Sequence, residues 1–142
     1  MIHHSGQPAG DAASLRELHM SWGLQGLGHH FVVGNGRGMG AGDVYVGERW
    51  INQQPGAHTV GANGDAHNQR SVGICLVGNG DRRPFADEQI ESVISLVRRL
   101  QRELGIPADR VFLHNDVAAE TTSPGRFFPV ARLREQLLAG SR

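Results

Sequence analysis

The chain has 142 residues, and its 14 basic side chains, all arginine, balance 14 acidic ones. This length fits one domain with a sizeable core, and the balanced charge gives no sign of electrostatic capture of nucleic acid or anionic lipid. The absence of lysine excludes a lysine base, a Schiff base and a P-loop lysine. A single cysteine, Cys75, excludes an intrachain disulfide, and no apolar run approaches the roughly 20 residues that span a bilayer. We therefore expect one domain over residues 1–142, with no insertion into a membrane.

The first expected elements are a short strand and an amphipathic helix. Residues 2–5 read as a strand, so we expect no signal peptide in this chain. Ser14 and Glu17 have the spacing of a capping box, which predicts a helix with Ser14 as its N-cap and an end near Gly23. One face of this helix is apolar and contains Leu15, Leu18 and Trp22.

A β-hairpin with a long glycine loop is expected next. Residues 30–33 and 43–46 are rich in strand-forming residues, and five of the nine residues between them are glycine. Such glycines also occur in dinucleotide-binding fingerprints. No helical pattern follows this loop, however, and a dinucleotide site is therefore disfavoured.

The second half alternates strands and helices. Residues 71–77 are almost continuously apolar, as is typical of a central strand covered on both faces. A helix of about 17 residues is then predicted, ending at Gly105 before Pro107. Its apolar residues at helical spacing are Ile90, Val93, Ile94, Val97, Leu100 and Leu104. Residues 110–113 are expected to form a strand and residues 129–138 a last helix. This alternation indicates an α/β fold around a central sheet.

Eight histidines are a noticeable enrichment for this length. Their spacing alone does not specify a metal site, because no HExxH or CxxC cluster is present. His3 and His114, however, each lie at a predicted strand and precede a loop. Neighbouring strand ends are where sites form in α/β sheets, so two residues distant in sequence can meet there.

Six short motifs in this order resemble the zinc-dependent N-acetylmuramoyl-L-alanine amidases, a family that includes phage endolysins, bacterial amidases and animal peptidoglycan recognition proteins. The motifs lie at residues 2–5 (Ile-His-His-Ser), 28–31 (Gly-His-His-Phe), 44–50, 56–58, 71–78 and 114–126. The resemblance covers nearly the whole chain. It implies a central mixed β-sheet flanked by about three helices and a single amidase-like domain.

The resemblance also implies a zinc site and a reaction. His3 and His114 match two zinc ligands of the family, and Ser123 occupies the third ligand position, where the family has cysteine or aspartate. The implied reaction is hydrolysis of the amide between N-acetylmuramic acid and L-alanine. Zinc would polarise the carbonyl group and lower the pKa of its bound water towards about 7. Because a serine hydroxyl is neutral, we expect weak, chelator-labile zinc binding.

Two further positions depart from the family pattern. His29 stands where a tyrosine is usual and could stabilise an oxyanion or relay a proton, or it could be a partly buried structural histidine. Thr121 stands where many members have lysine. We assign both residues to the catalytic site.

The remaining candidates are ranked by their match to the family. His30, His58 and Trp50 are assigned to substrate binding, although an aromatic residue at a strand end is more often part of the core. Asp116 is expected to cap a turn, and Glu120 could move inward as a replacement ligand. The residues expected to be structural or to have no matched role are His19, His67 and Cys75.

Two kinds of function are compatible with Ser123. One is a peptidoglycan hydrolase with altered metal affinity. The other is a peptidoglycan-binding module without catalysis, as in several animal members of the family that carry serine at this position. An engineered replacement of cysteine is a third interpretation. In each case we expect a monomer that contacts a muropeptide at the bacterial cell wall and binds no nucleic acid.

Overall fold

The structure is a computed structural model that describes residues 1–60 and 63–139. Its centre is a four-stranded sheet in the order β1-β4-β2-β3. The strands are β1 (Ile2–His4), β2 (Phe31–Val33), β3 (Val44–Val46) and β4 (Ile74–Leu76). Strands β1, β4 and β2 run parallel, whereas β3 is antiparallel to β2. The expected central mixed sheet is therefore confirmed.

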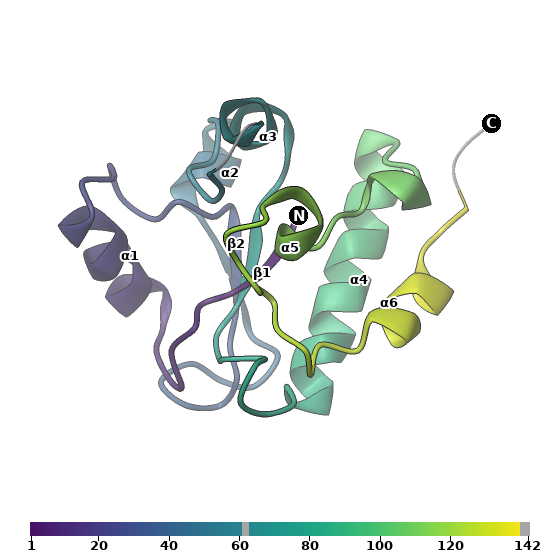
Figure 1. The fold of residues 1–142 in the computed structure, drawn as a ribbon, viewed down its shortest axis with the longest axis horizontal. Coiled ribbons are helices and arrows are strands. Elements are labelled where there is room, and N and C mark those ends of the chain that lie inside the picture. Colours follow the sequence, from purple (N-terminus) through teal and green to yellow (C-terminus); the bar gives the residue numbers. More distant parts are fainter. Residues whose placement is uncertain (61–62, 140–142) are drawn as a thin grey trace.

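Helices cover both faces of this sheet, with α1 on one side and α4 and α6 on the other (Figure 1). The helices are α1 (Ala12–Ser21), α2 (Glu48–Ile51), α3 (Gly64–Arg70), α4 (Asp87–Leu104), α5 (His114–Val117) and α6 (Val130–Gln136), with a 3-10 turn, η1, at Ala108–Arg110. They outnumber the three expected because α2 and α5 are single turns of four residues and α3 has only seven, too few to show a periodic pattern. None of the described helices is long and apolar enough to cross a membrane.

Alternate residues of β2 and β4 enter two separate cores. Ile74 and Leu76, together with Ile2 of β1, belong to the larger core under α4, whereas Cys75 and Val32 belong to the smaller core under α1. Because successive strand residues point to opposite faces, His3, which pairs with Cys75, faces the α1 side. The core position expected for Cys75 is confirmed, since this residue is fully buried.

Gln89 joins the long helix α4 to the ends of two strands. It is fully buried, and its Nε2 donates to the carbonyl oxygens of Val33, at 3.0 Å, and Val77, at 2.8 Å. Val33 O also accepts the Val77 N–H at 2.9 Å, whereas Val77 O lies beyond the end of β4 and accepts from Gln89. One amide side chain thus fixes the helix against the sheet.

Two details predicted from sequence are wrong. Asp11, not Ser14, is the N-cap of α1: its Oδ1 accepts the Ser14 N–H at 2.8 Å, and Ser14 Oγ accepts the Asp11 N–H at 2.9 Å. The strand expected at residues 110–113 is reduced to one parallel bridge between Leu113 and Ile2. This happens because η1 ends at Arg110 and α5 begins at His114, which leaves only a short connecting segment beside β1.

The glycine loop at residues 34–42 joins two antiparallel strands, β2 and β3, as expected. The Gly34 N–H donates to Asp43 O and the Gly42 N–H to Gly34 O, both at 2.9 Å, which closes the loop on itself. The loop is followed by a strand and not by the helix that a dinucleotide fingerprint requires. The disfavoured dinucleotide site is therefore excluded.

Candidate functional site

The sheet brings His3 and His114 together. The bridge between Ile2 and Leu113 places the next residue of each segment side by side, and Figure 1 shows α5, which His114 begins, beside β1. The two ring centres are 4.2 Å apart. His3 and His114 thus meet as their positions at predicted strands suggested, although the second segment contributes only one bridge.

Two more histidines pack against His3. The ring of His29, which precedes β2, has its centre 4.8 Å from that of His3, and the ring of His58, from the loop after α2, is at 4.9 Å. We call His3, His29, His58 and His114 the histidine cluster. The cluster lines a cavity of about 640 Å³, into which Thr121 and Ser123 also reach.

Burial keeps the histidine cluster neutral. Desolvation is the largest cause in each case and lowers the pKa of His3 and of His29 well below the usual range, with the neighbouring histidines lowering it further. It lowers the pKa of His58 to about 3 and that of His114 to about 4. Near pH 7 the cavity therefore presents imidazole lone pairs and not imidazolium cations.

A chain of contacts assigns the tautomer of His3. His58 Nε2 lies 3.4 Å from the carbonyl oxygen of Ser71, which can only accept, so we place the proton of neutral His58 on Nε2. His58 Nδ1 is then an acceptor and lies 3.0 Å from His3 Nε2. His3 must donate from Nε2, and its Nδ1 keeps a free lone pair. This is the arrangement in which a histidine binds metal with one nitrogen and is oriented through the other.

Asn68 holds the loop that carries His58. Its Oδ1 accepts the backbone N–H groups of His58, at 2.8 Å, and Thr59, at 3.0 Å. Its Nδ2 donates to Thr59 O at 2.9 Å. The side chain of Asn68, a residue of α3, therefore fixes the backbone segment from which the His58 side chain reaches His3.

Two buried nitrogen atoms of the cluster have no hydrogen-bond partner among the described residues. They are Nδ1 of His29 and Nε2 of His114. An unpartnered buried polar atom is costly, and in native proteins it often marks a position for an ion or a water molecule.

Ser123 is buried, and its backbone and side chain are both hydrogen-bonded. Its Oγ accepts the His4 N–H at 2.9 Å, and its own N–H donates to Thr121 Oγ1 at 3.1 Å. The loop lies tightly against the segment after β4, since a Cβ atom on Gly80 would be 1.9 Å from Pro124 O. Ser123 thus fastens the loop to β1.

The residues present fit a metal ion in part. His3 and His114 are adjacent, neutral and each have a nitrogen available, which suits zinc. Ser123 fits poorly, because its hydroxyl is neutral and directs one lone pair at the His4 N–H. As the side chains stand, no three His, Cys, Asp or Glu residues in the described part of the chain are arranged to hold a metal.

The two nearby carboxylates do not supply the missing ligand. Asp116 Oδ2 accepts the Leu113 N–H at 2.8 Å and lies 3.6 Å from Arg134 Nη2, which confirms it as a capping carboxylate. Glu120 is exposed and is not among the residues that line the cavity.

His30 and Trp50 lie outside the cavity. His30 is buried, with Nε2 at 2.9 Å from Gln54 O and Nδ1 accepting the Gly73 N–H at 3.0 Å. Trp50 packs 5.1 Å from Phe31, against the larger core. Both ring nitrogens of His30 are thus used by the backbone, and the assignment of these two residues to substrate binding stays a prediction.

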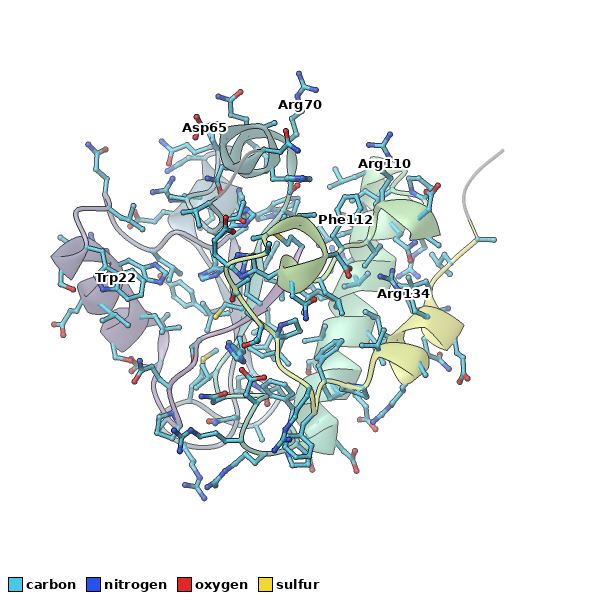
Figure 2. All side chains as sticks on the ribbon, in the orientation of Figure 1. Trp22, Asp65, Arg70, Arg110, Phe112 and Arg134 are labelled. Carbon is cyan, nitrogen blue, oxygen red and sulfur yellow. The ribbon has the colours of Figure 1, made fainter. Side chains whose placement is uncertain are left out.

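The cavity wall also contains residues that were not assigned to the site from the sequence. His19 is buried, its Nδ1 accepts the Gly28 N–H at 2.9 Å, and its ring stacks on Trp22 at 5.4 Å. Trp22, placed on the apolar face of its helix from sequence, is instead 65% exposed. Figure 2 labels it beside α1 and labels Asp65 on α3, and both side chains line the cavity. The only feature of the sequence that could have pointed to Trp22 as a site residue is its position immediately before Gly23, where the helix was expected to end.

Comparison with known proteins gives a consistent result. The model of the family described as N-acetylmuramoyl-L-alanine amidase matches residues 1–126. A peptidoglycan recognition protein of Bombyx mori is 33% identical over 101 residues, which is 70% of this chain and 45% of that protein. The chain thus spans about half the length of the curated relatives it matches.

Solved structures share the fold over most of the chain. The N-acetylmuramoyl-L-alanine amidase LysC from Clostridium intestinale superposes with a TM-score of 0.81 at 27% identity, covering 95% of this chain and 80% of LysC. The bumblebee recognition protein PGRP-SA gives a TM-score of 0.70 at 27% identity, covering 92% of this chain and 76% of that one.

Proposed function

Because the chain belongs to the N-acetylmuramoyl-L-alanine amidase family, we propose that it hydrolyses the amide between N-acetylmuramic acid and L-alanine in bacterial peptidoglycan, with zinc held by His3 and His114. One observation carries this proposal. Two neutral histidines from opposite ends of the chain lie side by side in a cavity, each with a ring nitrogen available to a metal. The family as a whole is generally zinc-dependent.

The cavity suits such a reaction in its chemistry. Zinc, when bound, would supply a Lewis acid that polarises the amide carbonyl group. His58 orients His3 through the bond between Nδ1 and Nε2, so the nitrogen that faces the cavity is a lone-pair donor. Thr121 Oγ1 accepts the Ser123 N–H, which leaves its O–H able to donate to a substrate oxygen.

The rim of the cavity offers a surface for a sugar or a stem peptide. Trp22 is exposed, stacks on His19 and lies beside the apolar Leu24, whereas Asp65 and Asn68 bring polar groups from α3. Exposed aromatic rings next to polar side chains are typical of carbohydrate-binding and peptide-binding clefts. We propose that this rim binds the muropeptide at the bacterial cell wall.

Ser123 favours a second candidate function, a peptidoglycan-binding module without catalysis. The hydroxyl contributes no negative charge, and its hydrogen bond with the His4 N–H is a structural contact that needs no metal. The two functions share a ligand and differ only in whether an amide bond is broken.

One experiment separates the two. Purified cell walls are incubated with the zinc-loaded chain and with a His114→Ala variant, and the release of free L-alanine amino groups is measured beside wall binding. Hydrolysis predicts amino-group release by the parent chain alone, with both proteins retained on the walls. If both proteins bind the walls and neither releases amino groups, the binding-module function is correct and the hydrolase is not.

A further inference from the structure

His29, like His114, has no hydrogen bond assigned to either ring nitrogen within the described residues. Its Nδ1 is fully buried and without a partner, as is Nε2 of His114. Its ring is 7% exposed and lies on the cavity wall. A buried histidine that served only the fold would normally have a backbone partner, as His19 and His30 do.

Two ring separations in the cluster are close to those of a metal centre. With Zn–N bonds of about 2.0–2.1 Å and tetrahedral angles, the ring centres of two histidine ligands lie roughly 5 Å apart. The ring of His3 is 4.8 Å from that of His29 and 4.2 Å from that of His114. The three nitrogens do not converge on one point as the side chains stand, so side-chain rotation is required.

The other neighbours of His3 are already engaged. His58 uses Nδ1 for His3 and Nε2 for the Ser71 carbonyl group. Ser123 accepts the His4 N–H and carries no charge. Besides His114, only His29 in the cluster combines an available nitrogen with contact to His3.

We propose that His29 supplies the third nitrogen of a three-histidine metal centre with His3 and His114, and that Ser123 takes no part in binding the metal. Imidazole nitrogens suit zinc and related divalent transition metals. The inference rests on the proposed metal dependence of this site and changes the identity of its third ligand. It explains why a chain without an anionic residue at position 123 also has an unusual histidine at position 29.

The test uses the whole chain, freed of metal by a chelator, and zinc alone as the probe. Zinc affinity is measured by competition with a chromophoric chelator for the parent chain, His29→Phe and Ser123→Ala. His67→Phe is the matched control, because His67 contacts Phe112 outside the cavity. We expect His29→Phe to weaken zinc binding by roughly 100-fold or more, because loss of an outer-shell partner alone costs about 10- to 100-fold.

The Ser123→Ala and His29→Phe variants distinguish the two possible third ligands, Ser123 and His29. Ser123→Ala and His67→Phe should each change the zinc dissociation constant by less than about threefold, since neither removes a ligand. Equal loss of affinity in Ser123→Ala and His29→Phe, or no loss in His29→Phe, overturns the proposal.

A measurement on the unmutated chain covers the case in which His29→Phe fails to fold. Imidazole nitrogen chemical shifts are followed by NMR while zinc is added. The proposal requires zinc-dependent shifts at His3, His29 and His114; shifts confined to His3 and His114, or no zinc binding, contradict it. Wall hydrolysis is scored separately. Zinc binding through His29 without wall hydrolysis would refute the proposed hydrolase but leave this ligand set standing. Wall hydrolysis with no zinc-dependent shift at His29 would refute the ligand set but leave the hydrolase standing.

Discussion

Nε2 of His3 lies 3.0 Å from Nδ1 of His58, a buried contact between residues 55 positions apart. Through this contact, the Ser71 carbonyl group, which accepts from His58 Nε2, determines which ring nitrogen of His3 keeps a free lone pair. The orientation of the first metal-binding candidate therefore depends on a loop that is not otherwise near β1 in sequence.

The first prediction concerns this contact. His58→Ala removes the acceptor, so His3 loses both its orientation and its tautomer preference, and zinc affinity should fall about 10- to 100-fold. His58→Asn keeps an acceptor oxygen near the position of Nδ1 and should retain affinity within several-fold. Chelator competition measures both variants. Equal losses in Ala and Asn would mean that His58 acts through packing and not through the hydrogen bond.

The second prediction concerns Ser123. Ser123→Cys introduces a potential thiolate ligand next to the histidine cluster, and zinc retention against a chelator should rise. If the chain is a hydrolase limited by occupancy, wall lysis at limiting zinc should rise in parallel, and the difference should vanish at saturating zinc. The readouts are metal content after dialysis and turbidity loss of purified walls. Tight zinc with no gain in lysis at any zinc concentration would place the deficit at His29 or Thr121.

The third prediction is the pH dependence of stability for the metal-free chain. Unfolded histidines take up protons as the pH falls through about 6.5, whereas burial keeps the pKa of His58 at about 3 and that of His114 at about 4 in the fold. Between pH 6.5 and 4 the unfolded state therefore binds more protons, and stability is full above this window and falls as the pH falls through it. His58 alone should contribute roughly 1.4 kcal/mol per pH unit.

Thermal unfolding with chelator present, from pH 7.5 to 4.5, tests this dependence. His58→Asn, which cannot titrate, should show a shallower slope than the parent chain. A melting temperature that stays constant down to pH 5 would mean that the buried histidines take up protons in the fold as readily as in the unfolded chain, so that their pKa values are not lowered.

The fourth prediction concerns the fold and leaves the cavity unchanged. Gln89→Leu has a similar volume but leaves the carbonyl group of Val77 buried without its donor, while Val33 O keeps the Val77 N–H, so the free energy of unfolding should fall by about 1–3 kcal/mol. Gln136→Leu, at an exposed position of α6, is the control and should change it by less than about 0.5 kcal/mol. Urea titration measures both. A loss below about 1 kcal/mol for Gln89→Leu would show that water replaces its hydrogen bonds.

Much of the fold could be predicted because its signals are local. The apolar spacing from Ile90 to Leu104 predicted the helix that became α4, and the glycine loop predicted the β2–β3 hairpin. The predicted N-cap of α1, Ser14, was wrong. Asp11 and Ser14 each accept the backbone N–H of the other, whereas the sequence shows only that two residues of suitable type have the spacing of a capping box.

The site was predictable where it depends on strand ends and not where it depends on loops. His3 and His114 meet through the register of one bridge, as the positions of two strand ends suggested. The contact of His58 with His3, and the wall formed by His19 and Trp22, depend on long-range folding of loops. No residue pattern within a short window encodes such contacts.

The hydroxyl of Ser123 also has a consequence for chemical durability. A thiolate at a metal site can be oxidised to a sulfenic acid and beyond, and the site then loses both its charge and its donor. This chain has only one thiol, Cys75, whose pKa is raised to about 12 by complete burial. If the imidazole nitrogens are its metal donors, as proposed above, a cavity whose loop is held by an alcohol keeps its donors under oxidising conditions that would inactivate a cysteine-containing counterpart.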